Sequence, residues 1–214
     1  MTRKSAFPAL LFCILVTGTS WGQKHPQLRY IAFDAGINMA GIRSAPEYQR
    51  HVGFLGASFS FSGNYSFNDE QSISASLTFE QKGAPEFVHK INTNLNYLTV
   101  PVLYKFSSTG KYPRFHLNAG AYCAYLMNAR RRGAVYNGDQ QLRISENITS
   151  EFRSLDYGIL LGAGMMLRLY DDIDFMINIH GAAGIPMIKD VSGSSPRNFN
   201  INISMGYVYY VGFR

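Results

Sequence analysis

Cysteine is almost absent from this chain, which has two cysteines in 214 residues. Cys13 lies in an N-terminal segment that we expect to be removed, so Cys123 would remain as a lone thiol. A lone thiol excludes an internal disulfide, and the stability of the protein must come from its fold. Closely spaced Cys/His ligand pairs are also lacking, so we predict no metal site and no cofactor. The histidines are scattered, at His25, His51, His89, His116 and His180.

Long apolar runs are lacking after the N-terminus. The one run, residues 6–16, is too short to span a bilayer as a helix, and it follows the basic residues Arg3 and Lys4. Ser20 and Gly22 are small residues at the −3 and −1 positions before Gln23. We therefore interpret residues 1–22 as a secretory signal peptide and residues 23–214 as one domain.

Alternation of apolar and polar residues is what the rest of the sequence contains in abundance. It is clearest between Asn198 and Phe213, where Asn, Ser and Gly occupy most of one face and bulky apolar residues occupy the other. A period of two over such a length predicts a β-strand with one apolar face. The apolar residues are Phe199, Ile201, Ile203, Met205, Tyr207, Tyr209, Val211 and Phe213.

The same alternation recurs along the chain and predicts eight strands. The connections alternate between short turns, near residues 68–70, 107–113 and 170–172, and long loops. Short turns at one end and long loops at the other are typical of a transmembrane barrel. We predict an all-β fold, an eight-stranded antiparallel up-and-down transmembrane β-barrel. The strands are expected near residues 30–40, 52–66, 72–82, 94–106, 114–127, 154–169, 172–182 and 198–213, with long loops at 41–51, 83–93, 128–153 and 183–197.

The fourth predicted strand is the least regular. Leu95 and Tyr97 share their parity with Thr99 and Lys105, whereas the other large apolar residues take the opposite parity. A bulge near Tyr97 would reconcile the two sets. Pro101 cannot donate to a strand ladder and predicts a local irregularity.

Charged residues are scarce on the polar faces of the predicted strands. A water-facing surface should carry roughly 25–35% Lys, Arg, Glu and Asp. Here Asn, Ser, Thr and Gly dominate, and small side chains suit the interior of a narrow barrel. Aromatic residues also gather at the strand ends, as in the girdles of membrane barrels. We therefore predict that the apolar faces meet lipid.

Two segments resemble the PorT-type outer-membrane β-barrel proteins of Bacteroidetes. They are Asn96–Lys105, with the sequence NYLTVPVLYK, and Gly158–Gly164, with the sequence GILLGAG. The resemblance implies a barrel in the cell outer membrane. It does not imply one activity, because one member of the family serves a secretion system and most have no assigned role.

The last strand resembles the assembly signal that the barrel-insertion machinery reads. The resemblance lies in Ser204, Gly206, Tyr209 and Phe213, although Arg214 follows where an aromatic residue usually ends the chain. It makes that machinery an expected partner.

The polar faces place ionisable residues inside the predicted barrel. Buried charges must be paired, so we predict that Lys105 and Arg168 meet Asp34 and Asp174. Two interpretations remain open: a structural network that rigidifies the barrel, and a proton-linked or ligand-binding site. The predicted lumen network comprises Asp34, Lys105, His116, Arg168 and Asp174 near the short turns, and Glu80, Asp156 and His180 near the long loops.

The run Arg130, Arg131, Arg132 stands out in the predicted loop 128–153. Arginine forks suit the phosphates of lipopolysaccharide, which is one interpretation. Pairing with Glu146 and Glu151 is the other. Export makes nucleic acid an improbable partner, and we expect none.

These observations favour a monomeric structural or interaction component of the cell envelope, acting through its outer loops. Outer-membrane lipid and lipopolysaccharide would surround it, and an envelope protein is a possible partner. A lipid-modifying enzyme is the alternative, but spacing puts neither Ser76 nor Ser154 beside His180, so we assign no catalytic residue and predict no enzyme. A narrow porin is a weaker alternative, because side chains fill a barrel of eight strands.

Overall fold

The computed structural model describes residues 27–43, 54–86, 91–137, 140–186, 188 and 196–211. The predicted signal peptide lies outside them. Within these ranges no helix has both the length and the apolar character that a membrane crossing requires. The elements are β1 (Gln27–Arg43), β2 (Phe54–Ser66), β3 (Gln71–Glu86), β4 (Ile91–Ser107), β5 (Arg114–Asn137), β6 (Gln140–Asn147), the 3-10 helix η2 (Thr149–Glu151), β7 (Leu155–Arg168), β8 (Ile173–Gly184) and β9 (Arg197–Tyr210).

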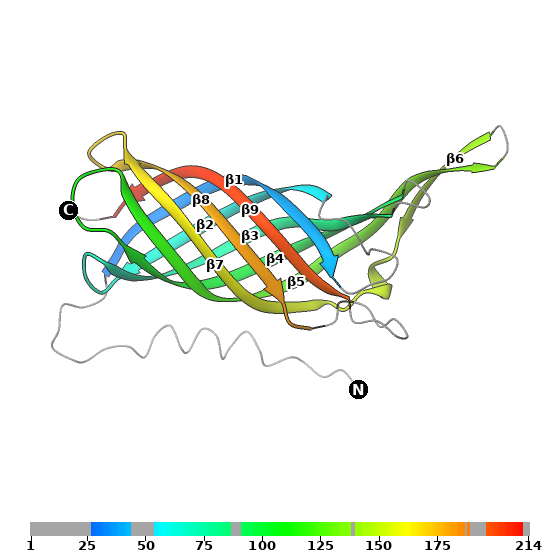
Figure 1. Cartoon of the computed structure of the whole chain (residues 1–214), viewed down its shortest axis with the longest axis horizontal. Coiled ribbons are helices and arrows are strands. Elements are labelled where there is room, and N and C mark those ends of the chain that lie inside the picture. The colour runs from blue at the N-terminus through cyan, green and yellow to red at the C-terminus, as the bar shows by residue number, and fades with distance from the viewer. Residues whose placement is uncertain are drawn as a thin grey trace.

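All the strands except β6 close into one antiparallel barrel (Figure 1). Strands that follow one another pair along the wall, and β5 skips β6 to pair with β7. Pairing of β9 with β1 closes the cylinder. The predicted fold class, an all-β barrel of eight antiparallel strands, is confirmed.

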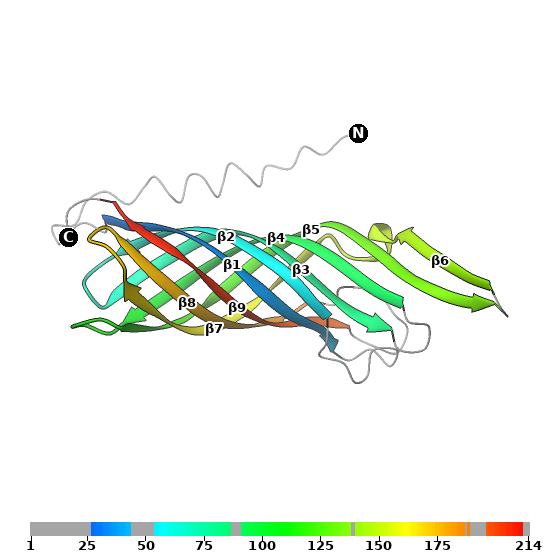
Figure 2. The ribbon, with the colours of Figure 1, turned by 90° about the horizontal axis from the view of Figure 1, so that it is seen from above.

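The prediction that residues 128–153 form a loop is wrong. β5 continues to Asn137, and β6 pairs with it from Arg130↔Asn147 to Asn137↔Gln140. This β5–β6 hairpin, residues 130–147, extends past the rim of the barrel (Figures 1 and 2). Beyond a membrane neither face of a strand must be apolar, so the alternation used to find strands fades there. The sequence Gly138-Asp139 is a two-residue hairpin signal that could have revealed it.

The irregularity predicted near Tyr97 lies on the neighbouring strand. Asn96 pairs with Asn128 but Tyr97 pairs with Leu126, so Met127 is the extra residue and the bulge belongs to β5. The side chains of β4 alternate between buried and more exposed without a break. Tyr97 therefore points into the barrel rather than toward lipid.

Pro101 does disturb its ladder, as predicted. The β3–β4 pairing keeps one register but is interrupted between the Ala75–Val102 and Thr78–Thr99 pairs. The gap lies where Pro101 lacks an N–H group to donate.

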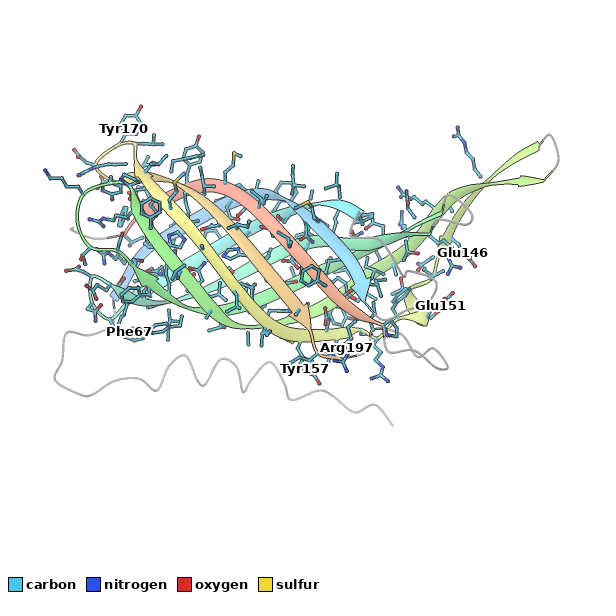
Figure 3. All side chains as sticks on the ribbon, in the orientation of Figure 1. Phe67, Glu146, Glu151, Tyr157, Tyr170 and Arg197 are labelled. Atoms are coloured by element: carbon cyan, nitrogen blue, oxygen red, sulfur yellow. The ribbon has the colours of Figure 1, made fainter. Side chains whose placement is uncertain are left out.

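The two faces of the wall differ as the sequence predicts. Large apolar side chains point outward, and Leu161 and Ile37 are 61% and 60% exposed. Asn, Ser and Thr point inward and are buried. Aromatic residues mark both ends of this apolar belt: Phe67 and Tyr170 lie at the short-turn end and Tyr157 toward the other end (Figure 3). Exposing such an apolar surface to water is unfavourable, whereas the apolar tails of lipid cover it without that penalty.

Candidate functional site

Lys82 is the most buried cation of the described lumen, with 1% of its side chain exposed. It projects inward from β3 near the long-loop end. Its Nζ lies 3.1 Å from Oε2 of Glu80 and 3.7 Å from Oδ2 of Asp156. The ring centroids of Tyr97 and Tyr122 lie 5.1 and 4.8 Å from the same nitrogen. Two carboxylates and two ring faces thus surround one ammonium group, and we call these five residues the lysine cage.

Neighbouring polar groups complete the lysine cage. Asn198 donates to Asp156 at 2.7 Å and to the hydroxyl of Tyr97 at 3.2 Å. Thr99 donates to Glu80 at 3.2 Å. Each buried carboxylate therefore accepts a hydrogen bond in addition to its ion pair with Lys82, which helps to offset the desolvation of a buried ion pair.

An apolar cluster closes the long-loop end of the barrel around the lysine cage. It includes both cage tyrosines together with residues from the barrel wall and the loops. Backbone bonds tie the loops down: Ile148 donates to Ala129 at 3.0 Å and Arg153 to Ile188 at 2.8 Å. The cluster contains Leu95, Leu126, Ile148, Phe152 and Ile188, with Tyr97 and Tyr122.

The middle of the lumen holds two histidines paired with amides. His116 Nε2 lies 2.9 Å from Oδ1 of Asn178, and His180 Nε2 lies 2.8 Å from Nδ2 of Asn118. A cavity of about 70 Å³ lies beside His180 and Asn178, with room for a few waters. Its walls include Asp34, Lys105, His180 and the small residues Ser58, Ser60, Ser62, Ser74, Ser76 and Thr78.

Tyrosines close the short-turn end. Tyr112 and Tyr210 donate their hydroxyls to Asp174 at 2.6 and 2.7 Å. Lys105 donates to the hydroxyl of Tyr30 at 2.9 Å. Tyr30 packs edge-on against Tyr210, with ring centroids 5.7 Å apart. Each end of the lumen thus combines an apolar cluster with a buried polar network, and small polar residues line the middle.

The predicted pairing of Arg168 with lumen acids is wrong. Arg168 ends β7, is 47% exposed on its side chain, and pairs with Asp171 of the adjacent turn at 3.2 Å. A long side chain at a strand end reaches water, where its charge is cheaper to keep. Tyr112 and Tyr210 donate hydrogen bonds to Asp174. Among the ion pairs within 4 Å in the described part of the chain, none joins Lys105 to Asp34.

The structure places the other predicted lumen residues inside the barrel but in separate groups. Glu80 and Asp156 belong to the lysine cage, while His116 and His180 lie in the middle. Sequence reasoning missed Lys82 itself. Its parity with Glu80, two positions earlier on the same strand, was the available signal.

The arginine run divides between two faces of the hairpin. Arg131 points toward Glu146 and Glu151, 4.0 Å from each, while Arg130 and Arg132 are exposed on the other face. Figure 3 shows both glutamates at the base of the hairpin. The pairing interpretation therefore holds for Arg131 alone.

The proposed assembly-signal residues lie on β9, with Ser204 and Gly206 inward and Tyr209 outward, 53% exposed. Phe213 lies outside the described residues.

No catalytic arrangement surrounds His180 in the described part of the chain. Its hydrogen-bond partner is Asn118, not a serine. Ser76 lines the central cavity, and Ser154 is exposed at the long-loop rim, directly before β7. His51 and His89 lie outside the described residues, within which no cluster of His, Cys, Asp and Glu could hold a metal ion.

Gly162 makes room for His180, which gives a test of the lumen packing. A Cβ at Gly162 would lie 2.1 Å from Cδ2 of His180, whereas one at Gly181 would meet nothing within 4 Å. We expect Gly162→Ala to destabilise the barrel by about 1–3 kcal/mol through overpacking. Gly181→Ala should be neutral or slightly stabilising. Urea unfolding of both variants in detergent measures this, and equal midpoints would contradict the packing described.

Comparisons with known proteins give one family and a set of similar folds. The sequence model of the family described as "Outer membrane protein beta-barrel domain" matches residues 21–190. Neisserial surface protein A is 13% identical with a TM-score of 0.51, and the match covers 88% of this chain and 100% of that one. OprG from Pseudomonas aeruginosa is 12% identical with a TM-score of 0.51, over 89% and 99%. No curated protein sequence matches the chain.

Proposed function

This chain belongs to the outer membrane protein beta-barrel domain family, and from that premise we propose that it is a non-conducting, non-catalytic component of the cell envelope. It is a small β-barrel protein of the cell outer membrane. In our proposal the barrel is an anchor, and the β5–β6 hairpin is the surface through which it meets other envelope components. We further propose that it is a PorT-type member, on the strength of Asn96–Lys105 and Gly158–Gly164.

The filled lumen is the observation that carries the proposal. The lysine cage and its apolar cluster close one end, and Tyr30, Tyr112 and Tyr210 close the other. The central cavity of about 70 Å³ has room for only a few waters. A barrel that neither conducts nor holds a nucleophile beside its base acts through its surfaces.

Planar-bilayer recording tests the first half of the proposal. We expect the purified protein to give no steady conductance above that of protein-free bilayers, because ions cannot cross the buried side chains of either end. A porin of roughly 16–18 strands, whose lumen is an aqueous channel, serves as the positive control. A stable open channel in repeated insertions would overturn the anchor role and favour a narrow porin.

Shortening the hairpin tests the second half. Gly133 pairs with Ile144, so residues 134–143 can be replaced by Asn-Gly, which suits a two-residue hairpin turn. We expect the shortened protein to keep the heat-modified gel shift of a folded barrel but to lose most of its chemical crosslinks to envelope proteins in intact cells. Unchanged crosslinks would show that the hairpin is not the interaction surface.

A further inference from the structure

One face of the β5–β6 hairpin collects arginines. Side chains directly opposite one another on antiparallel strands point to the same side. Arg130 lies opposite Asn147, Arg132 opposite Ser145, and Ala134 opposite Arg143. Arg130, Arg132 and Arg143 therefore share a face, and all are exposed. We call them the outer arginine face.

None of the acidic groups that the structure describes neutralises this face. The glutamates at the base of the hairpin, Glu146 and Glu151, lie on the opposite side with Arg131. In the described ranges no ion pair reaches Arg130, Arg132 or Arg143. β4 extends the same face with amides, because Asn94 and Asn92 pair with Arg130 and Arg132. Together with Ser145 and Asn147 these groups can donate hydrogen bonds to anionic oxygens.

The outer arginine face begins where the apolar belt ends. Among the β5 side chains whose exposure is described, Tyr125 and Met127 are the last large apolar ones exposed, at 56% and 52%. Arg130 follows on the same strand on the order of 10 Å further along. The strands of a membrane barrel tilt by roughly 35–45°, so roughly 10 Å along the strand is a rise of roughly 7–8 Å across the membrane. The polar headgroup region is roughly 5–7 Å thick on each side of the hydrocarbon, so Arg130 lies at its outer boundary and Arg132 and Arg143 lie just above it.

We propose that the outer arginine face binds the phosphate groups of the anionic glycolipid of the outer leaflet, lipopolysaccharide. Guanidinium forks bind phosphate through paired, charge-assisted hydrogen bonds. The face is roughly 13 Å long on the strand spacing, longer than one phosphate ion spans, so a lipid carrying several phosphates fits it better than free phosphate. The proposal rests on the hairpin being an interaction surface, as proposed above, and names what the surface binds.

The hairpin itself supplies a matched control for the test. The full-length processed protein, the variant R130Q/R132Q/R143Q and the control R131Q are refolded in the same detergent. Gel mobility with and without heating shows whether each barrel is folded. Thermophoresis then measures binding of fluorescent lipopolysaccharide, of the same glycolipid after enzymatic dephosphorylation, and of inorganic pyrophosphate.

We expect the triple variant to bind intact lipopolysaccharide on the order of 10- to 100-fold more weakly than the unchanged protein. R131Q should bind lipopolysaccharide within about twofold of the unchanged protein, because Arg131 lies on the opposite face, beside Glu146 and Glu151. The unchanged protein should also prefer the intact glycolipid to the dephosphorylated one. Raising the salt concentration should weaken its binding, since the contacts are exposed.

Three results would overturn the inference: equal binding by the triple variant, an equal loss in R131Q, or pyrophosphate binding as tight as that of the glycolipid. The crosslinking test of the shortened hairpin has a different readout, protein crosslinks, and that variant keeps Arg130 and Arg132 although it loses Arg143. Lost protein crosslinks with unchanged glycolipid binding in the triple variant would leave the proposed function standing and refute only the lipid assignment.

Discussion

Replacing Lys82 with methionine is expected to destabilise the barrel by about 3–5 kcal/mol. The ammonium group is the cation of the lysine cage, and both Glu80 and Asp156 are buried around it. Methionine fills a similar volume but leaves two carboxylates facing each other without a counter-charge. Removing one partner of a buried pair is costly because the remaining charge stays desolvated.

Unfolding in urea, in phospholipid vesicles, measures the effect, and Arg168→Met is the matched control. It removes a cation from a pair with Asp171 whose side chains are 47% and 98% exposed. Exposed pairs contribute at most about 1 kcal/mol, so this variant should remain near the original midpoint. If Lys82→Met shifted the midpoint no more than Arg168→Met, the lysine cage would not be a stabilising network.

A second variant distinguishes the loss of the lysine charge from the loss of its packing. Adding Glu80→Gln and Asp156→Asn to Lys82→Met removes the stranded negative charges while keeping the size of the side chains. Much of the lost stability should return, because an ion pair replaced as a whole is often close to neutral. A triple variant as unstable as Lys82→Met alone would place the effect in the packing of Tyr97 and Tyr122 against the lysine stem.

The barrel could be predicted from the sequence because lipid imposes a simple rule on each strand. Outward residues must be apolar, and a narrow interior needs small or polar ones, so β9 alternates along its whole length. This rule no longer applies where a strand leaves the lipid. Beyond the apolar belt, β5 and β6 carry arginines and amides on the outward face, and the pattern that revealed β9 says nothing about them.

The contacts inside the lumen could be predicted less well. Alternation gives the side of the wall on which a residue lies, but its partner depends on tilt and register between strands distant in sequence. Tyr97 and Asn198 meet across the barrel although 101 positions separate them. Arg168 shows the other limit: its parity is that of a lumen residue, yet its place at a strand end lets it reach water.

The free-energy cost of a charge placed in the apolar belt should depend on its depth in the bilayer. Leu161 and Leu155 lie on the same strand and the same face, at 61% and 56% exposure, so Arg at either position adds the same group to the same surface. Leu155 pairs with Tyr125 at the outer end of the belt, and Leu161 pairs with Ala119 well inside it. We expect Leu161→Arg to cost about 2–4 kcal/mol in a bilayer and Leu155→Arg about 0–1.

The two arginine variants also distinguish lipid from water as the surroundings of the belt. In vesicles the hydrocarbon penalises a guanidinium most near the bilayer midplane, and the side chain of residue 155 can reach the headgroups whereas that of residue 161 cannot. In water both substitutions would replace an exposed leucine with a well-solvated side chain, at a cost within about 0.5 kcal/mol. Urea midpoints that moved equally little for both variants would therefore contradict a lipid-facing belt, and with it the membrane position of the outer arginine face.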